Sequence, residues 1–97
     1  MFYRVRYAQP PRKLVIKHGT GELPLPAMLP PSPLEGHASL ALAAQSLEWH
    51  VIAEWPPGTP ETALTIEVEP DRLDKRSQTN WSIDARIEDV FTFAWKP

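Results

Sequence analysis

Apolar and polar residues alternate along most of this chain, and their period of two predicts half-buried β-strands. The clearest run extends from Leu47 to Trp55, where nearly every second residue is large and apolar. A second run extends from Thr62 to Glu69, after a break at 56–60 that contains three prolines and a glycine. Proline lacks the N–H of a strand ladder and fixes φ, so this break ends the first strand. The two runs together predict a hairpin.

The two ends of the chain alternate in the same way. Residues 3–7 and 13–17 each place apolar side chains on one face, and the short connection between them predicts another hairpin. Over residues 81–95 the odd positions are apolar except for Asp89, which predicts one long bulged strand or two shorter strands. Residues 71–80 are expected to form a turn and a loop.

Residues 23–33 contain five prolines, a density that excludes a regular helix or strand. We expect an extended strap with polyproline geometry, held on the sheet by its leucines and by Met28. The other interpretation is a displayed ligand for a proline-binding domain, because Pro30 and Pro33 have the spacing of such ligands. The many apolar residues of this segment favour the packed strap.

The segment 33–46 has two interpretations. Ser32 and Glu35 match a capping box, and the alanine and leucine content of the following residues favours a short helix. Leu40 and Leu42, however, also alternate as they would in a strand. We expect the helix.

These elements predict an α+β or nearly all-β fold. It would be a single small antiparallel sheet of about five or six strands, with one short helix and a proline-rich strap. A length of 97 residues fits one domain over 1–97, since compact domains most often have roughly 100–150 residues. The apolar content of 42% and charged content of 23% argue against a globally disordered chain. The absence of cysteine excludes disulfide and thiolate chemistry.

The sequence predicts a cytoplasmic protein with no membrane partner. The N-terminal residues lack the apolar run of a signal peptide, and no stretch approaches the roughly 18 apolar residues that cross a bilayer. We therefore interpret the sequon at 80–82 as incidental.

Charge is distributed unevenly along the chain. Residues 1–21 carry five cations and no acid, whereas residues 18–71 carry eight acids and neither Lys nor Arg. On the predicted N-terminal hairpin, cations would emerge together on the face opposite the core. We expect this charged face to bind a macromolecule, with a protein partner or a second copy favoured. Its candidate partner-binding residues are Arg4, Arg6, Lys13 and Lys17.

Two other interpretations of the basic residues remain. Neighbouring strands could neutralise them, because acids fall on the outward parity of the other predicted hairpin; these are Glu48, Glu54, Glu67 and Glu69. The basic hairpin could also bind nucleic acid, although a pI of 5.9 lies well below the value above roughly 9 that is typical of such domains.

His50 lies between Glu48 and Glu54 on one face of its predicted strand, as a general base or a metal ligand of a small hydrolase-like enzyme could. Same-side neighbours on a strand are about 6.5–7 Å apart, so a metal would need ligands from elsewhere. The sequence indicates none, and a solvated histidine is the simpler interpretation. The Gly-x-Gly at 19–21 precedes a proline run rather than a helix, so it does not predict a phosphate site. We expect no catalytic residue, metal or cofactor.

The chain has four tryptophans, and the alternation places all of them on core faces: Trp49, Trp55, Trp81 and Trp95. Exposed tryptophans would instead indicate a small-ligand or carbohydrate binder. The segment 91–95 would make an adhesive sheet edge if exposed, and dimerisation through it is a hypothesis. The function that the sequence favours is a non-catalytic interaction module.

Overall fold

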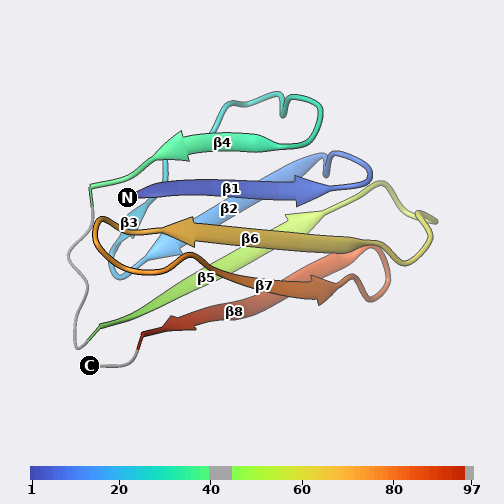
Figure 1. Cartoon of the computed structure of the whole chain (residues 1–97). Coiled ribbons are helices and arrows are strands. Elements are labelled where there is room, and N and C mark those ends of the chain that lie inside the picture. The colour runs from blue at the N-terminus through green and yellow to red at the C-terminus, as the bar shows by residue number, and fades with distance from the viewer. Residues whose placement is uncertain (40–44, 96–97) are drawn as a thin grey trace.

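The computed structural model describes residues 1–39 and 45–95 and shows two four-stranded antiparallel sheets packed face to face (Figure 1). Sheet A has the order β4-β1-β6-β7, with bounds Leu34–His37, Phe2–Tyr7, Ala63–Glu69 and Arg76–Trp81. Sheet B has the order β3-β2-β5-β8, with bounds Gly21–Glu22, Lys13–His18, Ser46–Glu54 and Arg86–Ala94.

The core lies between the two sheets. Trp49 on β5 contacts Tyr3 on β1 and Phe93 on β8 edge to face, with ring centroids 5.7 and 6.2 Å apart. Val5, Ile66 and other apolar residues of sheet A meet the inward side chains of sheet B. Each sheet therefore covers the apolar face of the other.

The prediction of a nearly all-β fold is confirmed, but the single sheet of five or six strands is wrong. Both predicted hairpins join strands of different sheets: β1 pairs with β4 and β6, whereas β2 pairs with β3 and β5. The apolar faces explain why, because one sheet would leave its apolar side without a covering layer. The connection between β1 and β2 crosses from sheet to sheet, and Trp55 Nε1 donates a hydrogen bond to the Gln9 carbonyl in it at 2.9 Å.

The predicted short helix is wrong over the described part of its range. The described residues contain no helix, and Leu34–His37 forms β4, which pairs with β1 in the register Tyr3↔Gly36. Pairing with β1 and burial of Leu34 outweigh the local capping signal. Residues 40–44 of the predicted helix lie outside the described residues.

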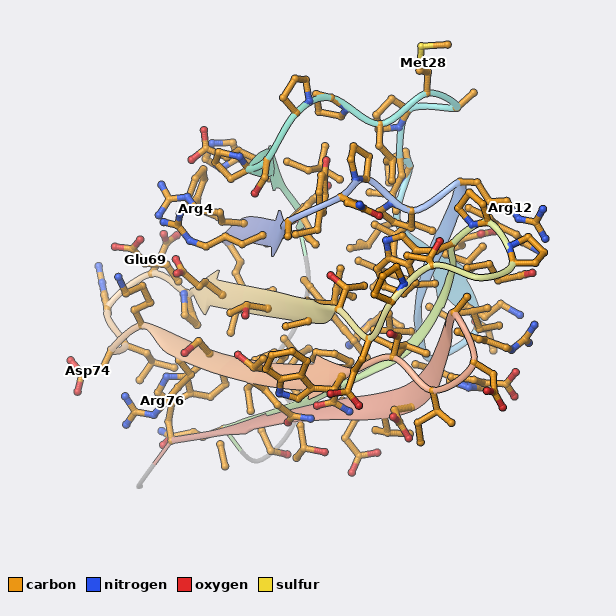
Figure 2. All side chains as sticks on the ribbon, turned by 90° about the vertical axis from the view of Figure 1, so that its right-hand side faces the viewer. Arg4, Arg12, Met28, Glu69, Asp74 and Arg76 are labelled. Carbon is orange, nitrogen blue, oxygen red and sulfur yellow. The ribbon has the colours of Figure 1, made fainter. Side chains whose placement is uncertain are left out.

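The proline-rich strap is observed as an irregular segment along one side of the sandwich. Leu23 is buried, Leu25 and Leu29 pack against the core, and the Pro30 carbonyl accepts a hydrogen bond from the Tyr7 hydroxyl at 2.5 Å. Met28, which we expected to pack, stands away from the body at the tip of the strap and is 88% exposed (Figure 2).

The predicted loop at 71–80 ends sooner than expected, because Arg76–Trp81 forms β7. Of the two alternatives for residues 81–95, the long strand is wrong: a two-residue turn at Asp84 and Ala85, both with positive φ, separates β7 from β8. The N–H of Ile83 and the N–H of Arg86 each donate to the other residue's carbonyl, at 2.9 and 3.1 Å. This turn has the φ signs of type I′, and the chain passes from sheet A to sheet B around it.

Candidate functional site

The four predicted partner-binding cations do not form one surface. Arg4 and Arg6 lie on the outer face of sheet A, whereas Lys13 and Lys17 lie on β2 in sheet B. The expectation of a single basic ribbon is therefore wrong, because β1 and β2 belong to different layers. Figure 2 likewise shows Arg4 and Arg12 on opposite sides of the molecule.

On sheet A, carboxylates neutralise both arginines. Arg4 contacts Glu35 on β4, with Nη2 and Oε2 2.6 Å apart, and donates to Glu67 on β6 at 3.2 Å. Arg6 donates from Nε to the other oxygen of Glu67 at 3.1 Å. Phe2 completes this cluster, since the Arg4 guanidinium lies 5.2 Å from the centroid of its ring.

These contacts change the acidity of Glu67. Burial alone would raise the pKa of this carboxyl, but the hydrogen bond and charge of Arg6, the charge of Lys75 and the hydrogen bond of Arg4 outweigh it and lower the pKa. Neutralisation between neighbouring strands, one of the alternatives that the sequence allowed, therefore describes Arg4 and Arg6 well.

A similar arrangement occurs on the outer face of sheet B. Glu54 on β5 lies between Lys13 and Arg86, with N–O distances of 3.7 and 3.5 Å. Lys17 is the cross-strand neighbour of His50. His50 is exposed, as expected of a solvated histidine, and its other cross-strand neighbour is Val90 on β8.

The tryptophans do not all lie in the core. Trp49, Trp55 and Trp95 are buried, as predicted, but the side chain of Trp81 is on the outer face of sheet A and is 57% exposed. The prediction failed because the odd parity of β8 was extended back across the turn at Asp84 and Ala85. That turn contains no glycine, the residue that most often marks positive φ in such turns.

A hollow of about 370 Å³ lies beside Trp81 on this face. Its walls include Ala63, which is opposite Trp81 in the β6–β7 register, and Thr65 in the next outward position of β6. Arg6 borders it from β1, and Glu61 borders it from the segment before β6. We call this hollow the Trp81 groove.

The Trp81 groove combines an apolar surface with polar groups at its border. The indole of Trp81 provides the apolar surface. Arg6 keeps half of its side chain exposed although it contacts Glu67, and Glu61 is exposed. The Thr65 hydroxyl lies 2.7 Å from the Thr79 hydroxyl of β7. A ligand here would meet one cation, one carboxylate and a hydroxyl group around the Trp81 ring.

Buried groups hold the groove in place. Tyr7 points inward, and the Ser32 hydroxyl accepts a hydrogen bond from its backbone N–H at 3.1 Å. The Thr62 N–H donates to the Ser82 hydroxyl at 2.9 Å, and both residues are buried. Burial raises the pKa of the Tyr7 hydroxyl. Hydrogen bonds between backbone and side chains therefore anchor two of the segments that line the groove.

The comparisons with known proteins identify no relative: no protein-family model, curated protein or solved structure matches this chain. Among residues 1–39 and 45–95, no group of three or more His, Asp or Glu side chains could hold a metal ion. The same residues include no helix of the length and apolarity that a membrane span needs.

Proposed function

We propose that this protein is a non-catalytic interaction module that binds a protein partner on the outer face of sheet A, at the Trp81 groove. The observation that carries the proposal is the exposure of Trp81 beside a hollow that Arg6 borders. Trp and Arg are enriched among the few residues that supply most of the binding energy of an interface. The remaining candidates of the predicted set have smaller roles, since Arg4 is engaged by two carboxylates and the lysines lie on sheet B.

Arg6 and Glu61 also suggest how a partner would be oriented. A partner that covers the indole could place a carboxylate near Arg6 and a cation near Glu61, and such complementary charges fix the register of an interface. The backbone beside the groove is already held by hydrogen bonds at Tyr7 and Thr62, which reduces the ordering cost of association.

The proposal is tested by affinity capture from the cells that contain this protein. Trp81→Ala and Arg6→Glu should each reduce recovery of the partner at least about tenfold, because central interface residues contribute about 2 kcal/mol or more. Ile83→Ala is the control for loss of an exposed apolar side chain outside the groove, since Ile83 is 76% exposed. Lys17→Glu is the charge-reversal control on sheet B. Equal recovery with all four variants contradicts the proposal.

A second candidate function is binding of a small ligand or carbohydrate in the same groove. The observation that favours it is the groove's volume, which lies within the roughly 300–1,000 Å³ range of small-molecule sites. Titration with a panel of sugars should then change the tryptophan fluorescence of the wild type but not that of Trp81→Phe. A panel without any change in the wild type excludes the sugars tested.

A further inference from the structure

The two sheets of this sandwich end in four edge strands, and most of them are poor templates for another strand. β3 has two residues and β4 has four. β8 is long, but side chains of β7 occupy part of its free edge. Gln78 Oε1 accepts from the Thr92 N–H at 3.0 Å, and Arg76 Nε donates to the Ala94 carbonyl at 3.2 Å. The predicted adhesive edge at 91–95 is therefore partly covered.

The edge of β7 differs from these edges. The Ser82 N–H donates to the Thr62 carbonyl at 2.8 Å, which makes this a hydrogen-bonded pair one position beyond the ladder. Hydrogen-bonding direction alternates along an antiparallel strand, so residues 76, 78 and 80 point their backbone groups at β6. The backbone N–H and C=O groups of Ser77, Thr79 and Trp81 consequently point away from β6.

The outward side chains of β7 do not protect this edge. Natural edge strands are commonly blocked by charged residues, proline, bulges or short length. β7 has six residues without a proline, and its three outward side chains, Ser77, Thr79 and Trp81, are exposed and uncharged.

We propose that the β7 edge pairs with the β7 edge of a second copy of this chain, antiparallel and about a two-fold axis at Thr79. This inference does not rest on the proposed function, although Trp81 belongs both to the β7 edge and to the Trp81 groove. Thr79 of each copy would face Thr79 of the other, and Ser77 would face Trp81. Each of these hydrogen-bonded pairs would exchange two backbone hydrogen bonds, which joins the two A sheets into one continuous sheet.

Self-complementarity is the reason to favour a second copy as the occupant. In this register Gln78 faces Asn80 and Arg76 faces Ser82, so no like charges are opposed between residues 76 and 82. On β8, by contrast, a two-fold axis at Glu88 would oppose this carboxylate to its own copy. Like charges in directly opposed positions destabilise strand pairing. Among the described edge strands, β7 thus has six residues, backbone groups that point away from β6, and no like charges opposed along the strand.

The two-fold axis at Thr79 allows a sharp test by sedimentation over a concentration series of the purified protein. The wild type should rise from the 11.0 kDa of one chain toward twice that mass. Thr79→Asp and Thr79→Lys should each remain monomeric, because each variant opposes its own charge across the axis. An equal mixture of the two should recover the dimer. Thr79→Val is the matched control: like the other variants it removes the hydroxyl contact with Thr65, yet it should dimerise as the wild type does.

Three results would overturn the inference: a monomeric wild type at every concentration, single-charge variants that dimerise as the wild type does, or a mixture that does not recover. Circular dichroism checks that each variant is folded. Amide exchange of the wild type gives a test without substitution, since the Thr79 N–H should become protected as concentration rises. The Glu35 N–H, on the free edge of β4, should not. Equal behaviour of the two amides contradicts pairing at β7.

Discussion

The hydroxyl of Tyr3 on β1 lies directly against Gly36 on β4, at a point where a Cβ atom on Gly36 would be 2.5 Å from the hydroxyl oxygen. The two residues are cross-strand partners, so this contact sets how closely β4 approaches the core side of sheet A. Glycine is required at this position because any side chain would displace the buried Tyr3 ring or separate the strands.

Gly36→Ala should therefore destabilise the protein by about 1–3 kcal/mol, the range for inserting atoms into a packed site. Gly21→Ala is the matched control, because its Cβ would meet only the His18 carbonyl at an ordinary 3.5 Å. Denaturant unfolding should show a lower midpoint for Gly36→Ala and little change for Gly21→Ala. Equal midpoints for the two variants would show that β4 can move aside.

Glu67 should make the stability of the fold depend on pH. Its pKa is below the ordinary 4.5, since Arg6, Lys75 and Arg4 together outweigh the effect of burial. A carboxyl with a lower pKa in the folded state stabilises that state above its unfolded pKa, and this contribution is lost as the pH falls through the folded pKa. Below about pH 4.5 the free energy of unfolding should thus decrease more for the wild type than for Glu67→Gln. Glu22→Gln controls for removal of a carboxylate elsewhere, and parallel curves for all three proteins would contradict the ion-pair account.

The side chain of Gln78 should protect one amide of β8 from exchange. Its carbonyl oxygen accepts from the Thr92 N–H, which points away from the partner strand β5. Gln78→Ala removes this acceptor, at a net cost of about 1 kcal/mol for a typical hydrogen bond, so Thr92 should exchange several-fold faster. Amide exchange by NMR measures this, with Phe93 as the internal reference because its N–H points toward β5. An unchanged exchange rate at Thr92 would contradict the hydrogen bond from its N–H to the Gln78 side chain.

Trp81 should account for most of the tryptophan fluorescence that an aqueous quencher can reach. It is the exposed member of the four tryptophans, whereas the other three are at most 6% exposed. Trp81→Phe should therefore remove the steep component of acrylamide quenching. Trp95→Phe is the control and should leave that component in place. Equally steep quenching in both variants would place Trp81 away from solvent.

The sequence predicted those strands in which apolar residues alternate strongly, but not which strands pair with one another. The alternation from Leu47 to Trp55 identified β5 and its buried face correctly. β7 was missed because none of the inward-facing residues of Arg76–Trp81 is apolar. Apolar and polar residues therefore do not alternate along this strand. The division into two sheets could not be predicted from alternation, which gives the buried face of a strand but not its neighbours.

The candidate site was predicted only in part. Arg6 was selected as a cation on the outward parity of its strand, and it does border the Trp81 groove. Trp81 was assigned to the core because the alternation of apolar residues continues across Asp84 and Ala85. Both residues have positive φ, and neither is a glycine that would have indicated a turn. Because of the turn, Trp81 lies on the outer face, where it is the most exposed aromatic side chain of sheet A.

The central claim, that a partner binds the outer face of sheet A at Trp81, is tested most directly by photo-crosslinking. A photoreactive phenylalanine analogue replaces Trp81 in one variant and Val90, which is half exposed on the outer face of sheet B, in another. Irradiation in the cells that contain this protein should give an adduct with a different protein from position 81 and none from position 90. An adduct of twice the chain mass would report the second copy and is distinguished by its size. Partner adducts from position 90 alone, or equally from both positions, would contradict the account.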